Sequence, residues 1–160
     1  MNKHLSIFTV AFLIVSVGLA LCASAQAQGR RARGRTYTKE EVDRIIKRVE
    51  TRSDEFVKEF DKALDKSALD KTEREDELNR YAKDLEKALD ELRREFHRRD
   101  LWIENKSEVR KCLDMASEID VAMRNRQLGG EAESTWTALR FDLNTLAKVY
   151  DLPLVGSKKY

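Results

Sequence analysis

Histidine and cysteine most often supply a catalytic base, a nucleophile or a zinc ligand, and this chain has only two of each. His97 lies in a basic run, without the further nitrogen or thiolate ligands that a zinc or haem site requires. A di-iron bundle would need two Glu-x-x-His motifs, and the sequence contains none. We therefore expect no enzymatic activity, no metal and no cofactor, and we interpret His97 as a solvated surface residue.

Cys112 occupies an apolar position of a helical stripe. A buried free cysteine packs as a small apolar residue, so core packing is the favoured interpretation. The alternative is an intermolecular disulfide that joins two copies, which would require Cys112 at the surface. The sequence has no Ser/His/Asp set and no glycine-rich phosphate loop, so it indicates no small-molecule substrate.

The N-terminus has the order of a secretory signal peptide. Lys3 is followed by an uncharged, mostly apolar run from Leu5 to Leu21, and then by the small residues Ala23-Ser24-Ala25. We predict that residues 1–25 are a signal peptide, cleaved near Ala25, and that the mature protein is periplasmic or secreted.

Two alternatives to cleavage stay open. A lipoprotein would carry its lipid on Cys22, but Leu21 before it is too large for that signal. An uncleaved N-terminal membrane anchor is the second alternative, because the apolar run is close in length to a membrane helix and arginines follow it.

Residues 26–36 are polar and rich in glycine and arginine, which predicts a disordered linker. Arg30, Arg31, Arg33 and Arg35 form a cationic arm within it. These arginines are candidates for weak contact with an anionic lipid or cell-wall polymer. The alternative is a soluble linker with no partner.

The length and the composition indicate one helical domain. After residue 25 the chain has 135 residues, with 30 basic and 29 acidic side chains. A general nucleic-acid binder needs a net basic surface, so we expect no nucleic acid. The 38% of charged residues and the single proline are typical of long exposed helices.

Four segments carry apolar residues every three or four positions, which predicts amphipathic helices. Thr38 with Glu41 forms a capping box for the first, which runs to about Leu69. The other three span about 72–99, 105–128 and 132–151. Thr72 with Glu75 and Asn105 with Glu108 repeat the capping pattern, and Gly129-Gly130 separates the third helix from the fourth.

The predicted fold is all-α: an antiparallel up-down bundle of about four amphipathic helices over residues 37–152, with coiled-coil-like periodicity. The first two helices are expected to form a long hairpin, and the alternative is one continuous helix through residues 70–75. Residues 153–160 are expected to form a flexible tail.

Trp102 and Ile103 lie in the connection between the second and third helices. They either close the end of the bundle or form an exposed apolar contact for a partner or a membrane surface.

Three stretches carry a resemblance: Ala23–Ala25, Lys62–Ser67 and Leu139–Tyr150. On these the chain resembles small exported helical-bundle proteins of bacteria, and this resemblance implies no particular activity. The chain is also similar to periplasmic helical chaperones of the stress-response type in its signal, its long charged helices and its lack of a cofactor. Their Leu-Thr-x-x-Gln motif is absent from the sequence.

These observations predict an exported, non-enzymatic helical-bundle protein that binds macromolecules or acts as a chaperone in the cell envelope. Its expected partners are envelope proteins or a second copy of itself. A structural self-associating helical module and an N-terminally membrane-anchored helical protein are the alternatives.

Overall fold

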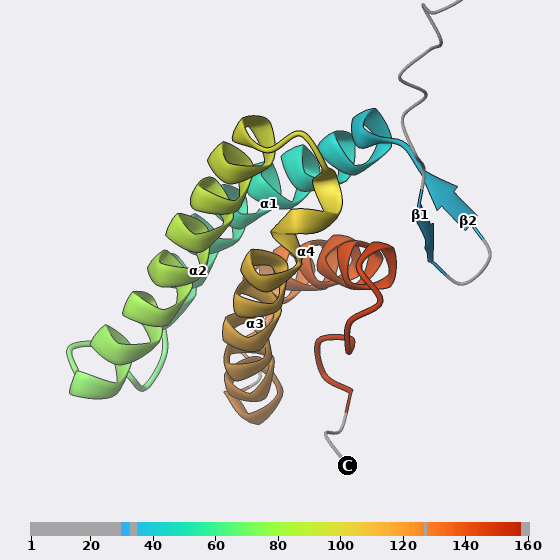
Figure 1. Cartoon of the computed structure of the whole chain (residues 1–160). Helices are drawn as coiled ribbons and strands as arrows, with labels where there is room; N and C mark the ends of the chain where they lie inside the picture. Colours follow the sequence, from blue (N-terminus) through green and yellow to red (C-terminus); the bar gives the residue numbers. More distant parts are fainter. Residues whose placement is uncertain (1–29, 33–34, 127, 158–160) are drawn as a thin grey trace, which may run out of the picture.

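The computed structural model describes residues 30–32, 35–126 and 128–157, and the predicted signal peptide lies outside these ranges. Four long helices dominate the chain (Figure 1). The elements are β1 (Arg30–Ala32), β2 (Arg35–Tyr37), α1 (Lys39–Asp65), α2 (Glu73–Arg98), the 3-10 helix η1 (Trp102–Asn105), α3 (Lys106–Arg126) and α4 (Gly130–Val149).

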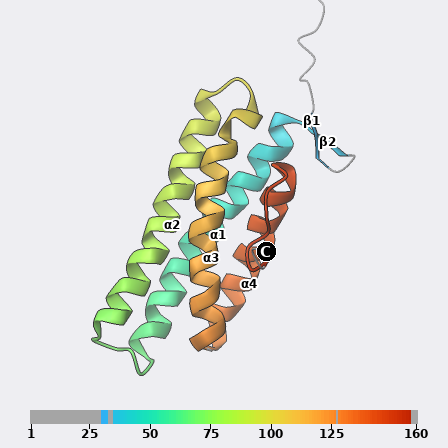
Figure 2. The ribbon, with the colours of Figure 1, turned by 60° about the horizontal axis from the view of Figure 1, so that its bottom comes forward.

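The helices form the predicted antiparallel up-down bundle. α1 packs on α2 and α4, α2 packs on α3, and α3 packs on α4, so each helix has two main neighbours. Figure 2 shows α1 and α2 as a hairpin whose connection lies at one end of the molecule. The predicted hairpin is therefore confirmed. One core contains buried side chains from all four helices.

α1 begins with the predicted capping box. The backbone N–H of Glu41 donates to Thr38 Oγ1 at 3.2 Å, and the backbone N–H of Thr38 donates to Glu41 Oε2 at 3.0 Å. These bonds satisfy two N–H groups at the start of the helix. The apolar stripe of α1 is buried as expected, with Phe56 and Phe60 stacked at 5.0 Å between ring centroids.

α1 ends at Asp65, earlier than the predicted end near Leu69. The hydroxyl and the backbone N–H of Ser67 both donate to the carbonyl of Leu64, at 2.8 and 2.9 Å. This tightens the last turn, because Leu64 then bonds three residues ahead instead of four. The chain next reverses through Lys71, whose φ is +61°, and α2 begins after Thr72. The two helices are therefore separate, as predicted.

The start of α3 differs from the prediction. Asn105 belongs to η1, and its Nδ2 donates back to the carbonyl of Trp102 at 3.3 Å. Its Oδ1 has no hydrogen-bond partner among the described residues, so Asn105 does not cap α3. The prediction failed because η1 continues directly into α3. Asn105 is therefore the last residue of a 3-10 helix and not the residue that precedes a helix.

The glycine pair separates α3 from α4 as predicted. Gly129 and Gly130 both have positive φ, +67° and +57°. Residues with a Cβ rarely adopt this conformation, and it turns the chain sharply enough for α4 to run back along α3.

Two terminal segments differ from their predictions. Arg30–Ala32 pairs antiparallel with Arg35–Tyr37, so strands lie where we expected a linker without regular structure. At the other end, Leu152 and Val155 are buried in the core. The predicted flexible tail, residues 153–160, therefore packs on the bundle at Val155, because Val155 and the preceding Leu152 both reach the core.

Candidate functional site

The structure places Cys112 in the core, where it is 1% exposed. Burial raises the pKa of its thiol to about 12, so the thiol stays protonated. The core interpretation is confirmed. The alternative, a disulfide between two copies, is contradicted, because the sulfur is not at the surface of the folded bundle.

His97 lies on the outer side of the α1–α2 hairpin and is exposed, as predicted. Its Nε2 accepts a hydrogen bond from Arg93 Nε at 3.1 Å and lies 3.5 Å from Asp43 Oδ1. These contacts join the two helices at the surface and do not assemble a catalytic set.

Trp102 closes the end of the bundle. It is 6% exposed, and its ring meets that of Tyr150 edge to face at 5.2 Å. The hydroxyl of Tyr150 donates to the carbonyl of Trp102 at 2.9 Å, and burial raises the pKa of Tyr150. The interpretation that Trp102 closes the end of the bundle is therefore confirmed, and the alternative, an exposed contact for a partner or a membrane surface, is contradicted for Trp102. Ile103 is half-buried against the core, whereas the neighbouring Leu101 is exposed.

The contact of the cationic arm with an anionic lipid or cell-wall polymer stays a prediction. Arg33 lies outside the described residues, and the side chains of Arg30, Arg31 and Arg35 are also not described. The structure shows only that the backbone carrying three of them forms the strands that precede α1.

A buried carboxylate that the sequence analysis missed joins α3 to α4. Asp120 is fully buried, and its Oδ1 accepts from Trp136 Nε1 at 3.1 Å and from Arg140 Nη1 at 2.9 Å. Arg124 Nη2 lies 2.9 Å from Oδ2, although no donor among the described residues is aligned with that oxygen for a hydrogen bond. The signal in the sequence was an acidic residue beside Ile119, followed by arginine four positions later.

An open groove of about 210 Å³ lies beside this carboxylate, between α3 and α4. Met123 and Trp136 form its apolar floor, and charged side chains surround them. Its lining residues are Asp120, Met123, Arg124, Glu133, Trp136, Thr137 and Arg140. We call it the α3–α4 groove.

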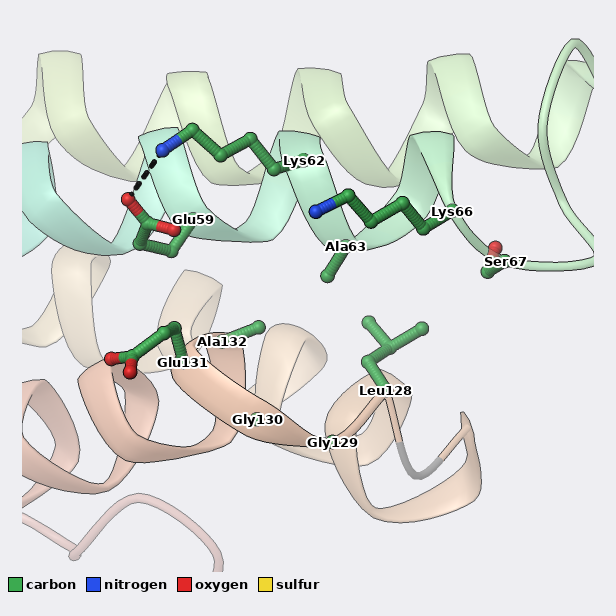
Figure 3. Close-up of a pocket in the computed structure, with 10 residues that line it drawn as sticks. All are labelled: Glu59, Lys62, Ala63, Lys66, Ser67, Leu128, Gly129, Gly130, Glu131 and Ala132. Atoms are coloured by element: carbon green, nitrogen blue, oxygen red, sulfur yellow. Dashed lines mark hydrogen bonds and ion pairs between the residues drawn. The ribbon is translucent and has the colours of Figure 1, made fainter.

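A second groove, of about 490 Å³, lies between the end of α1 and the turn that leads into α4. Figure 3 shows Ala63 of α1 and Leu128 of the turn directed into this space, with Lys66 above them. Lys62 forms an ion pair with Glu59 at 2.8 Å on the rim. We call it the α1–α4 groove. It has apolar side chains inside and charged ones at its edge.

A third cluster consists of carboxylates at the α1–α2 turn. Within the part of the chain that the structure describes, Asp65, Asp70 and Glu75 offer ligand atoms within 4.8 Å of one another. Glu75 Oε2 accepts from the backbone N–H of Lys71 at 2.6 Å, and Lys71 Nζ lies 3.5 Å from Asp70 Oδ2. The backbone N–H and the ammonium group of Lys71 thus partly satisfy the carboxylates of Glu75 and Asp70. This arrangement indicates that the carboxylates help to shape the turn.

The fold and these grooves define the class of protein as an all-α up-down bundle with open surface grooves. Comparisons with protein-family models, with curated proteins and with solved structures found no match. None of the helices described by the structure combines the length and the apolar character needed to cross a lipid bilayer.

Proposed function

We propose that the protein is an exported, non-enzymatic helical bundle that binds other macromolecules, with unfolded proteins of the cell envelope as its clients. The signal-like N-terminus and the resemblance to exported helical proteins support the compartment. The long charged helices and the grooves support a binding role.

The observation that carries the proposal is the position of the two grooves. The α1–α4 groove includes Gly130, Glu131 and Ala132, and the α3–α4 groove includes Glu133 and Trp136. The first half of α4 is therefore flanked by a groove on each side. Apolar floors with charged rims are suited to apolar side chains of a peptide whose backbone and ends stay in water.

Suppression of aggregation tests this proposal. The protein should prevent the aggregation of a chemically denatured client at a near-stoichiometric ratio, measured by light scattering. Absence of suppression at tenfold excess would refute the chaperone-like function.

A pair of charge reversals locates the binding surface. Lys62→Glu with Lys66→Glu changes the rim of the α1–α4 groove, and we expect it to weaken suppression at least threefold. Lys58→Glu with Lys87→Glu changes the net charge equally, at exposed positions outside both grooves. Equal suppression by the two double variants would show that the α1–α4 groove is not used.

Self-association is a second candidate, and one observation favours it. Phe141 on α4 is 69% exposed, which is unusual for a large aromatic side chain. Pairing of α1 with its copy would need a free apolar face on α1, whereas the apolar stripe of α1 is buried. Sedimentation over a concentration series tests the candidate: Phe141→Ser should shift a dimer to monomer, and a strict monomer at high concentration would eliminate it.

The compartment has its own test. Mass spectrometry of the N-terminus after cell fractionation distinguishes three forms of the protein: cleaved, lipidated, and uncleaved in the membrane. Cleavage near Ala25 supports export, whereas lipid on Cys22 or an intact N-terminus in the membrane fraction would replace that proposal by an anchored form.

A further inference from the structure

An open groove on α1 is lined mainly by cations. Its volume is about 570 Å³, and five of its six lining residues are exposed, so it faces solvent directly. Four of the six are basic and one is acidic. The lining residues are Arg44, Lys47, Arg48, Thr51, Arg52 and Glu55, all on α1. We call it the α1 basic groove.

A buried carboxylate of α4 holds two of these cations in place. Asp142 is 2% exposed, and its Oδ2 lies 2.7 Å from Arg52 Nη1 and accepts from Arg48 Nε at 3.4 Å. Arg52 also donates to the carbonyl of Ala138 at 2.9 Å. The two guanidinium groups are therefore positioned before a ligand arrives, and such preorganisation lowers the entropic cost of binding.

The other two cations leave the groove with net positive charge. Neither Arg44 nor Lys47 forms a hydrogen bond or an ion pair with another residue that the structure describes, although Glu40 attracts Arg44 electrostatically. Within and behind the groove, four cations face only the carboxylates of Glu55 and Asp142. The groove is thus suited to anionic groups such as phosphate.

An exposed aromatic side chain lies next to the groove. Phe141 is 69% exposed and immediately precedes Asp142 on α4. It is three residues from Ala138, and residues at this spacing share one side of a helix. Because Arg52 contacts both Ala138 and Asp142, Phe141 lies on the outer surface of α4 near its seam with α1. Basic side chains beside an exposed aromatic ring match the phosphates and the apolar boundary of a lipid surface.

The charge of the chain changes sign along the α1–α2 hairpin. Residues 30–52 contain nine basic and four acidic side chains, whereas residues 53–90 contain eight basic and thirteen acidic ones. The first segment includes the strands and the start of α1, and the second surrounds the α1–α2 turn, at opposite ends of α1 (Figure 2).

This separation lets the basic end act independently of the acidic one. The ends of a helix of this length are about 40 Å apart, whereas the Debye length is about 10 Å at moderate salt. The near-neutral charge of the whole chain therefore does not prevent attraction of the basic end to an anionic surface.

We propose that the α1 basic groove and Phe141 form a docking surface for an anionic lipid bilayer. Lipid phosphates bind between Arg44, Lys47 and Arg48, and the ring of Phe141 enters the boundary between headgroups and acyl chains. The arginines that precede α1 in the sequence add to the attraction, and repulsion of the acidic turn tilts it away from the bilayer. This surface is separate from the α1–α4 and α3–α4 grooves, so the inference goes beyond client binding and does not depend on it.

Sedimentation with lipid vesicles tests the proposal. The chain from residue 26 is used, because it keeps every helix and strand that the structure describes and lacks the apolar run at residues 5–21, which would itself enter lipid. It is studied at a concentration at which it is monomeric. It should bind vesicles of phosphatidylglycerol and phosphatidylcholine at least tenfold more tightly than vesicles of phosphatidylcholine alone, and added salt should weaken the binding. Equal binding to both kinds of vesicle would overturn the proposal.

A pair of double variants tests the groove, with circular dichroism to verify folding. Arg44→Gln with Lys47→Gln should weaken binding to the anionic vesicles at least tenfold, because each basic side chain near the lipid surface contributes to binding. Lys58→Gln with Lys87→Gln removes the same charge at exposed positions outside the groove and should bind within twofold of the unmodified chain. Equal loss in the two double variants would mean that net charge alone decides binding, and no loss in the first would assign binding to residues 26–37. Either result would refute the docking surface.

Phe141→Ser tests the choice of a bilayer as the partner. This variant should bind the anionic vesicles at least threefold more weakly. Val121→Ser is the control, because Val121 is 47% exposed on α3, which is not a main neighbour of α1, and it should leave binding unchanged. Unchanged binding by Phe141→Ser would overturn the bilayer as the partner, and inorganic polyphosphate would then test a soluble polyanion in its place.

The vesicle assay and the aggregation assay have separate outcomes. Vesicle binding without aggregation suppression would sustain the docking surface and refute the chaperone function. Suppression without vesicle binding would refute the docking surface and sustain the chaperone function.

Discussion

Removal of the Asp120 carboxylate should measurably weaken the contact between α3 and α4. Asp120→Ala leaves the indole N–H of Trp136 buried without its partner, which costs about 1–3 kcal/mol. The two arginines contribute less, because Arg124 and Arg140 are 55% and 37% exposed and can return to water. Each of these ion pairs is worth about 0–1 kcal/mol.

We therefore expect Asp120→Ala to lower the free energy of unfolding by about 2–4 kcal/mol. Asp120→Asn keeps an oxygen that can accept from Trp136 and should cost about half as much. Urea unfolding followed by circular dichroism gives these values. Glu118→Ala, at an exposed position of the same helix, is the control and should stay within about 0.5 kcal/mol of the unmodified chain.

The reasoning fails if Asp120→Ala is no more destabilising than Glu118→Ala. That result would mean that the cost of burying the carboxylate cancels its hydrogen bonds, as occurs for some buried ion pairs. Asp120→Leu would then be at least as stable as the unmodified chain, which the same unfolding experiment would show.

Three further predictions concern other parts of the bundle. The thiol of Cys112 should react with a thiol reagent at pH 8 at least a hundredfold more slowly in the folded chain than in urea, because burial raises its pKa to about 12; equal rates would contradict the buried position. Desolvation and the neighbouring charges of Asp54 and Asp90 raise the pKa of Glu86, while desolvation and Asp90 raise that of Asp54. The folded state therefore holds these protons more tightly than the unfolded chain, and the ionised carboxylates oppose folding above their raised pKa values. Asp54→Asn should accordingly raise the midpoint of urea unfolding at pH 7, with a gain that shrinks as the pH falls toward about 4. Thr38→Ala should cost about 1 kcal/mol through loss of the cap, measured by thermal unfolding, with a cost near zero as the opposing result.

The helices were predictable because their pattern is local. Apolar residues three or four apart fix which face of each helix is buried, and the cap at Thr38 and the glycines 129 and 130 act within a single turn. Short connections then favour antiparallel neighbours, so the topology followed from the lengths of the loops.

The charges inside the bundle were not predictable in this way. Asp142 is buried, yet it is paired with Arg52 at 2.7 Å and lies 3.4 Å from Arg48, both on α1. The side chain of Arg52 also donates to the carbonyl of Ala138. Such pairs join residues that are about ninety positions apart, so no local pattern contains them.

The burial of Leu152 and Val155 was missed for a related reason. Leu152 and Val155 are only two apolar residues beside a proline and a glycine, which is also the composition of a loose terminus. Their burial depends on the space between α3 and α4, which exists only after the bundle has formed. Trp102 was left with two interpretations, because the position of a tryptophan in a connection does not reveal which way its ring turns.

The contacts between α1 and α4 also bear on the order in which the molecule assembles. α1 and α2 meet across a short turn, whereas Arg52 and Ala138 are separated by 86 residues. Closing so long a loop costs more entropy than closing a hairpin. We expect the α1–α2 hairpin to form early and the docking of α4 onto α1 to complete folding. A substitution that weakens the contacts between α1 and α4 should therefore accelerate unfolding and leave the refolding rate almost unchanged.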